Sequence, residues 1–430
     1  MKKTFLIFTS LLSLALMAQE KTWTLQDCIQ YALDNDLSLK EAALNMEFYQ
    51  KEITAAYGNL LPNAALYADH QYNFGSVIDP TTNARVSSDI QSNSLSFSSN
   101  IELFNWGNFI QIQTTKLQKE KAKFDQEIKK NELIVRIVQT FTQIQYDKEQ
   151  IELLENQLKN TEITLNQIQK EFELGNKAKS DVYELMANKI SEEQLLLSAR
   201  NAFKVSETAM LNLLNLKEKI DFLSTEELRI APLQDEVEEL YAVGSALRPE
   251  IKSANLQKEI ARKKIQLQRS NFLPRVNGNY SLSSFYVDLE TASLRDQFKN
   301  NKNHYLGLSI QMPLFNRWQT RTAIQQAKIE WAQADLQVEQ QKQAYFNALR
   351  EVFTQTENAY DNWRKAEENV AAQEISFEKT EEKYRLGMLD AYGYFAAKNG
   401  LLNAQNALLQ AKYNYHYQSV LLQFYVTNEW

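Results

Sequence analysis

The residue types that most often build reactive or metal-binding sites are scarce in this chain. Its three histidines, His70, His304 and His416, lie far apart, and Cys28 is its one cysteine. A structural zinc or copper site needs about four such ligands at close and regular spacing. None of these residues has a partner at such a spacing, so the sequence predicts no metal site and no cofactor. We interpret Cys28 as a small buried residue rather than a reactive thiol.

Carboxylates and glycine loops offer no better basis for catalysis. The adjacent pairs Glu367–Glu368 and Glu381–Glu382 lie in helical stretches, where such residues usually form a solvated face. The chain contains no G-x-S-x-G nucleophile motif, no phosphate-binding glycine loop and no dinucleotide turn. Its formal net charge of −7 also disfavours nucleic acid as a partner. We therefore expect no catalytic residues and no enzymatic activity.

The first residues predict export from the cytoplasm. Lys2 and Lys3 precede an apolar run that ends at Met17, and the small residue Ala18 follows, as in a secretory signal peptide at residues 1–18. That run is too short for a membrane-spanning helix, and no later segment supplies a longer one. An exported chain of this kind is periplasmic, secreted or inserted in a membrane as a β-barrel.

Two stretches without glycine or proline predict unusually long helices. These residues are absent between Asn108 and Leu174 and between Leu314 and Leu386. Because they normally end helices, their absence permits two helices of roughly 70 residues, each roughly 100 Å long at a rise of 1.5 Å per residue. In the first stretch every seventh residue is apolar, as in a coiled coil: Ile137, Ile144, Ile151, Leu158, Leu165 and Phe172.

The second stretch repeats the first at an offset of 212 positions. The matching seam residues are Leu349, Thr356, Trp363, Val370, Phe377 and Tyr384. Both arms end in a Leu-Gly pair, Leu174–Gly175 and Leu386–Gly387, where the chain needs a positive φ after the helix. The sequence therefore indicates an internal duplication.

We accordingly divide the mature chain into repeat 1 (19–216), a connector (217–238) and repeat 2 (239–430). Each repeat is expected to hold a first helix, a β-hairpin with a polar loop, a long helix and a return helix. In repeat 1 these are 24–61, 64–104 with its loop at 75–92, 107–174 and 181–216. In repeat 2 they are 246–270, 275–315 with its loop at 287–303, 317–386 and 390–428.

The two clearest predicted strands alternate between apolar and polar residues. One face of each carries a row of apolar side chains, while the other carries mainly serine, amide and tyrosine residues. Each of the four strands is about 10 to 12 residues long, the length that a tilted membrane strand needs. A pair of soluble hairpins packed on the helices is the alternative, since such sheets also alternate. The lipid-facing candidates are Leu95, Phe97, Ile101, Leu103, Leu306, Leu308, Ile310 and Met312.

Four strands cannot close a membrane barrel alone, because such barrels need at least about eight. An open sheet edge in hydrocarbon is very costly, so strands that enter a membrane have to be pooled by several copies of the chain. We therefore expect an obligate homo-oligomer, and two repeats per chain would give a trimer near-sixfold regularity.

This order of elements resembles the outer-membrane efflux protein family, the TolC-like channels, over essentially the whole mature chain. The most specific stretches are residues 172–175 with Asp181–Val182 six positions on, and residues 384–387. The resemblance implies a mainly α fold with a membrane β-barrel. Three chains would contribute four strands each to a 12-strand barrel, and their coiled-coil hairpins would form a hollow periplasmic cylinder.

The resemblance also implies a gate at the helix tips. Asp181 matches the acidic residue of the first tip and Tyr384 the tyrosine of the second, and Asp390 is a further candidate. From the residues alone, Asp181 is equally interpreted as a helix N-cap paired with Glu184, and Tyr384 as a packing residue. The sequence departs from the family where a basic residue and two ring aspartates often stand, at Leu389, Gly393 and Ala396.

The function implied by the resemblance is a passive exit duct of a tripartite efflux or type I secretion system, located in the outer membrane with a large periplasmic portion. The implied partners are two further copies in a homotrimer, a periplasmic adaptor (membrane fusion) protein, an inner-membrane pump and outer-membrane lipid. Leu174, Gly175, Leu386 and Gly387 would meet the adaptor. The alternative is a periplasmic coiled-coil scaffold without channel activity. The cargo, whether a drug, a metal or a protein, stays open.

Overall fold

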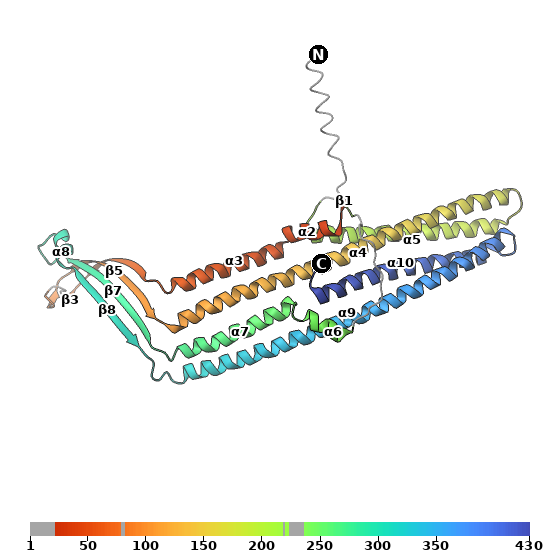
Figure 1. The fold of residues 1–430 in the computed structure, drawn as a ribbon. Coiled ribbons are helices and arrows are strands. Elements are labelled where there is room, and N and C mark those ends of the chain that lie inside the picture. Colours follow the sequence, from red (N-terminus) through yellow and green to blue (C-terminus); the bar gives the residue numbers. More distant parts are fainter. Residues whose placement is uncertain (1–21, 79–81, 218–219, 223–235) are drawn as a thin grey trace, which may run out of the picture. The chain divides into compact units, whose positions relative to one another are not determined.

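The structure is a computed structural model that describes residues 22–78, 82–217, 220–222 and 236–430 (Figure 1). The predicted signal peptide at 1–18 and much of the predicted connector at 217–238 lie outside these residues. The chain divides into two compact units. Unit 1 comprises Met1–Ala42, Asp125–Ile251 and Lys342–Trp430, and unit 2 comprises Ala43–Phe124 and Lys252–Gln341.

Helices and strands follow one another in the same general order in both halves of the chain. The first half contains β1 (Thr22–Trp23), α2 (Leu25–Asn35), α3 (Leu37–Gly58), β2 (Asn63–Asn73), β3 (Ser76–Ile78), β4 (Arg85–Ser87), β5 (Ile90–Phe104), α4 (Trp106–Glu173) and α5 (Lys179–Leu214). The second half contains β6 (Asp221–Phe222), α6 (Val237–Gly244), α7 (Pro249–Ser270), β7 (Arg275–Val287), α8 (Leu294–Asn300), β8 (Asn303–Gln311), α9 (Gln319–Arg385) and α10 (Ala391–Thr427).

The long helices α4 and α9 have 68 and 67 residues, and Figure 1 shows α5 returning alongside α4 and α10 alongside α9. Their central seam residues favour this structure: Ile137, Ile144 and Leu349 are fully buried, so this part of each helix gains apolar burial about every second turn. Among the described residues, no helix has an apolar stretch of the length and hydropathy that a bilayer crossing requires.

The strands β2, β5, β7 and β8 form one antiparallel sheet in unit 2, in that order. Its central pair, β5 and β7, joins the two halves of the chain and places Phe97 opposite Leu282. β2 and β8 are the outermost strands, so each has a neighbour on one side only within the described chain. Alternation along each strand sends successive side chains to opposite faces of this sheet.

Both hairpin loops contain structure that the sequence analysis missed. Residues 75–92, expected to be a loop, include the short hairpin β3–β4, in which Val77 pairs with Val86. Residues 287–303 include helix α8, capped by the Ser293 hydroxyl, which accepts a hydrogen bond from the Asp296 N–H. The Gln297 side chain pairs with the last residue of β7. Its Oε1 accepts from the Val287 N–H and its Nε2 donates to the Val287 C=O, both at 2.9 Å.

Three predicted boundaries were wrong for identifiable reasons. The first helix is two helices, because Asp36 adopts an extended conformation and its carboxylate accepts from the Leu39 N–H at 2.9 Å. The helix predicted at 246–270 is preceded by a separate helix α6, and α7 starts at Pro249, a residue suited to a first helical position. β8 ends at Gln311 rather than 315, since Pro313 lacks the N–H of a strand residue.

The core of unit 1 surrounds Cys28, which is fully buried with neighbours from α2, α4 and α5. Burial raises the pKa of its thiol to about 12, so the thiol stays protonated and behaves as a small apolar group. The parallel pair β1–β6 adds Trp23 and Phe222 to the same core. The structure therefore supports the buried interpretation of Cys28.

Candidate functional site

The two tips of the helical arms are built on the same backbone motif. At the first tip, Gly175 has φ +82°, its N–H bonds the Phe172 C=O at 2.9 Å, and the next N–H bonds the Glu171 C=O at 2.8 Å. At the second tip Gly387 has φ +75°. Its N–H bonds the Tyr384 C=O at 3.1 Å, and the next N–H bonds the Lys383 C=O at 2.9 Å. This is the Schellman ending, which satisfies the last carbonyls of a helix and requires a left-handed residue.

Steric crowding does not explain why these two turns carry glycine. A side chain added at Gly175 or Gly387 would meet no atom within 4 Å, so only the positive φ demands glycine. The preceding leucines project into solvent: Leu174 is 72% exposed and Leu386 is 68% exposed.

Tyr384 lies inside the core of the tip region rather than on its surface. It is only 7% exposed and stacks on Tyr394 with ring centroids 4.7 Å apart. The Lys177 ammonium lies 4.3 Å from the Tyr384 ring centroid, within the range of a cation–π contact. The surrounding apolar cluster takes residues from all four helices: Ile168, Leu185, Ala391, Tyr394 and Phe395, with Leu165, Val182, Phe377 and Leu389 at its margin.

The structure brings Asp181 and Tyr384 together electrostatically. Burial and, to a smaller extent, the nearby negative charge of Asp181 together raise the pKa of Tyr384 to about 12. Asp181 is not the N-cap of its helix, because α5 begins at Lys179 and its N-cap is Ala178, which makes no side-chain cap. The N-cap alternative, with Glu184 as its partner, was therefore wrong. Asp181 instead lies in the first turn, where a carboxylate favours the helix dipole.

Asp390 and its neighbours form a compact second tip. Asp390 is the N-cap of α10, and its Oδ1 accepts from the Gly393 N–H at 2.9 Å. A side chain at Gly393 would approach the Leu389 Cδ1 to 2.8 Å and the Asp390 Oδ1 to 3.2 Å. Leu389 itself packs on the tip core, whereas Ala396 is exposed. Two of the departures from the family pattern, Leu389 and Gly393, are thus linked, because Leu389 packs against the position that a side chain at Gly393 would occupy.

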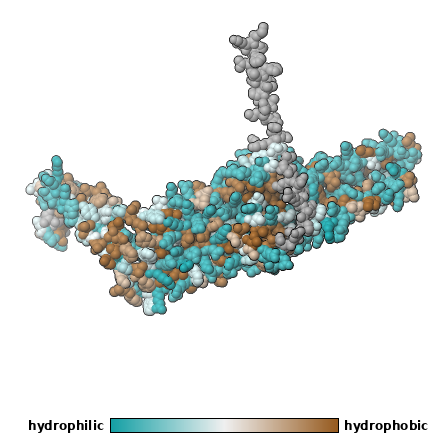
Figure 2. All heavy atoms as spheres, in the orientation of Figure 1, coloured by the Kyte–Doolittle hydropathy of each residue, from teal (hydrophilic) through white to brown (hydrophobic). Residues whose placement is uncertain are grey.

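The four-stranded sheet has one apolar and one polar face. The register places the apolar rows of β5 and β8 on the same face, because Phe97 lies opposite Leu282 and Leu306 opposite Tyr280. The apolar candidates on β8 are largely exposed, as Leu308 is at 66%, and Figure 2 shows hydrophobic residues gathered over this end of unit 2. On the same face, Leu95 and Leu103 are exposed, while Phe97 and Ile101 are half-buried; Met312 lies just beyond the end of β8 and is exposed.

The opposite face of the sheet is lined by hydroxyl and amide groups. The register aligns Ser98 with Ser281 and Asn100 with Asn279 across the central pair.

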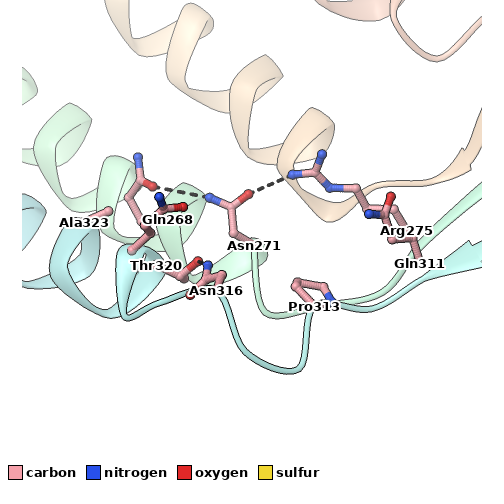
Figure 3. Close-up of a pocket in the computed structure, with 9 residues that line it drawn as sticks. Gln268, Asn271, Arg275, Gln311, Pro313, Asn316, Thr320 and Ala323 are labelled. Carbon is pink, nitrogen blue, oxygen red and sulfur yellow. Dashed lines mark hydrogen bonds between the residues drawn. The ribbon is translucent and has the colours of Figure 1, made fainter.

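Near the helix end of the sheet lies a pocket of about 350 Å³ between α7, α9 and the strands β7 and β8. In Figure 3 Asn271 lies between Gln268 and Arg275, and its Oδ1 accepts from the Arg275 guanidinium at 2.8 Å. The lining residues of this pocket carry no acid–base pair.

The histidines remain separate in space as they are in sequence. His70 bonds Asn93, His304 lies 3.0 Å from the Tyr280 hydroxyl, and His416 is on α10, where burial lowers its pKa. No group of three or more histidine, cysteine or acidic residues with metal-binding geometry occurs in the described part of the chain.

Thr161 of α4, Glu192 of α5 and Lys398 of α10 form a buried polar layer that was not predicted from the sequence. Their exposed fractions are 0%, 4% and 6%. The Lys398 ammonium donates to the Thr161 hydroxyl at 2.5 Å and to the Glu192 carboxylate at 3.3 Å, and the same hydroxyl donates to that carboxylate. One signal was available: Thr161 stands three positions after the seam residue Leu158, where a coiled coil expects an apolar residue.

Comparison with known proteins reveals one family over most of the chain. The model of the family described as "Outer membrane efflux protein" matches residues 28–216 and 244–427. The matched segments include both long helices, both tips and all four strands of the sheet.

Individual relatives are distant but cover nearly the full length. The chain is 22% identical to outer membrane protein TolC of Vibrio cholerae serotype O1, covering 96% of this chain and 93% of that protein. It is also 22% identical to the proteases secretion protein PrtF of Dickeya chrysanthemi, covering 96% and 90%. The crystal structure of CusC superposes with a TM-score of 0.80 at 15% identity, covering 94% and 91%. This likeness confirms the predicted fold class.

Replacing Gly175 with alanine tests the turn geometry. Gly175→Ala should weaken the tip by about 1–2 kcal/mol, because an L-residue resists a φ of +82°. The measurement is amide hydrogen exchange at residues 171–181, which should accelerate. Gly400→Ala is the matched control within helix α10, where alanine should be neutral or stabilising by about 1 kcal/mol. Slower exchange in Gly175→Ala would contradict the assignment.

Two substitutions at Tyr384 separate packing from hydrogen bonding. Tyr384→Phe keeps both ring contacts and should change the local opening free energy by no more than about 1 kcal/mol. Tyr384→Leu loses the stack on Tyr394 and the Lys177 contact, and should cost about 1–3 kcal/mol. Hydrogen exchange at the tip measures both. Equal losses in the two variants would show that the hydroxyl, rather than the ring, holds the tip together.

Proposed function

The chain belongs to the outer membrane efflux protein family, and from this premise we propose that it forms the passive exit duct of an efflux or secretion system. It is an outer-membrane protein whose helices form a large periplasmic portion. Its relatives carry names that refer to an outer-membrane protein in one case and to protease secretion in another. The proposal adds how this chain would build and gate the duct.

The observation that carries the proposal is the two-faced sheet with two open edges. Its apolar face exposes Leu306, Leu308 and Ile310, which would be unfavourable in water and is favourable in lipid. Its other face offers hydroxyl and amide groups suited to a water-filled lumen. A periplasmic scaffold would gain nothing from this division, so the two-faced sheet favours the duct over that alternative.

Assembly into a homotrimer would satisfy the sheet edges. β8 of one copy would pair with β2 of the next, and three copies would close a barrel of twelve strands. The edges have comparable length, with 11 residues in β2 and 9 in β8. Closure would remove every unpaired edge from the hydrocarbon, which is the requirement for a strand-built membrane protein.

The helix tips would form the gate and the contact to periplasmic partners. Leu174 and Leu386 with their turn glycines would meet an adaptor protein, and an inner-membrane pump would supply the energy. Asp181 and Tyr384 would hold the tips closed through the tip core, while Asp390 acts through its cap on α10. The channel itself would need no catalytic residue and no cofactor.

Conductance in planar bilayers tests the duct directly. The mature protein should migrate as a heat-resistant trimer on gels, fractionate with the outer membrane and give discrete conductance steps. A protein that remains a soluble monomer after signal removal would contradict the proposal. So would a membrane trimer that never conducts, even after the tips are loosened by Tyr384→Leu.

A pair of adjacent substitutions tests the assignment of the two sheet faces. Leu308→Arg places a charge on the lipid face and should cost about 2–4 kcal/mol if it lies near the midplane, so little trimer should reach the membrane. Ser309→Arg, one residue on, faces the polar side and should assemble normally with altered conductance. Trimer yield in the outer-membrane fraction measures both. Equal yields for the two variants would refute the assignment.

A further inference from the structure

The polar layer of Thr161, Glu192 and Lys398 interrupts an otherwise apolar interface. On the tip side it is followed by the tip core, which includes Ile168, Leu185 and Tyr394. On the other side it is followed by a second apolar cluster that includes Leu154, Leu196 and Leu402. On each of the three helices the layer residue falls between residues of these two clusters. A charged pair thus lies between two apolar layers.

Through Lys398 the layer joins the two arms of the chain, in addition to joining the two helices of the first arm. Thr161 and Glu192 lie on α4 and α5, which the first tip turn connects, whereas Lys398 lies on α10, which the second tip turn connects to α9. Any motion that separates the arms near the tips has to part Lys398 from Glu192. The neighbouring pair Lys189–Glu162, at 3.0 Å, joins only α4 and α5 and would stay intact.

A buried ion pair responds to such a separation differently from an apolar contact. Removing two charges from water is expensive, and the charges recover their hydration once water enters between the helices. Burial lowers the pKa of Lys398, which reflects the same cost of holding its charge out of water. Apolar side chains at these positions would stabilise the closed arms, and they would recover no favourable hydration when the arms separate.

We propose that Lys398, Glu192 and Thr161 set the balance between the closed and open tips, as a polar layer that holds the arms together when dry and eases their separation when hydrated. The inference rests on the proposed duct function. In the proposed duct these three side chains are positioning residues, since none of them touches the cargo. The layer lies between the tip core and the next apolar cluster, and it acts independently of the Leu-Gly turns.

The experiment compares three variants of the full trimer in planar bilayers. Lys398→Met leaves the Glu192 carboxylate buried without its cation, so the closed state should weaken and the open probability rise by about tenfold or more. Lys398→Met with Glu192→Leu replaces both charges by apolar groups of similar size, so the open probability should fall below that of the wild type. Lys189→Met with Glu162→Leu is the matched control and should behave as the wild type.

The double variant decides between gating and mere stability. If the layer only stabilised the trimer, the double variant would recover wild-type heat resistance and also gate like the wild type. Wild-type gating or increased leak in the double variant would therefore overturn the proposal, even where Lys398→Met alone fails to assemble. Failure of the duct function is distinguishable, because then the wild-type trimer itself gives no conductance.

Discussion

The backbone of two edge strands is the constraint on which the rest of the molecule depends. β2 and β8 each have a partner on one side within the chain, and their exposed apolar face suits them to lipid rather than water. An unpaired peptide group in hydrocarbon costs several kcal/mol, and each edge presents a row of them. In the proposed duct a single chain would therefore be incomplete, and a duplication that supplies four strands per copy would reduce the number of copies needed for closure.

In the proposed duct the helical arms would have to be stable and yet separable. Seam residues such as Ile137, Ile144 and Leu349 supply apolar burial in the middle of α4 and α9, while both tips end in the same glycine motif. The arms are nevertheless unequal: the N-cap of α10 is the carboxylate residue Asp390, whereas the N-cap of α5 is Ala178, which has no polar side chain to form a cap. Buried polar groups occur at intervals between the apolar layers, as at Asp147, which accepts from the Ser206 hydroxyl at 2.6 Å.

Sequence periodicity carried the prediction where the controlling interactions are local. Helices without glycine or proline and strands with strict alternation could be predicted, because each follows from a few neighbouring residues. The N-cap alternative for Asp181 was wrong because an acidic residue followed by Glu184 resembles a capping pattern, and only backbone geometry distinguishes a cap from a first turn. Lys398 and Glu192 are 206 positions apart, so no local pattern could reveal their pairing.

The interlocked side chains at the second tip also restrict how this protein can change over generations. Leu389 fills the space that a side chain at position 393 would need, and it is anchored in the tip core. An acidic residue arriving at Gly393 alone would meet both this leucine and the Asp390 carboxylate. Any side chain at position 393 would require Leu389 to move, so we expect the residues at positions 389 and 393 to change together.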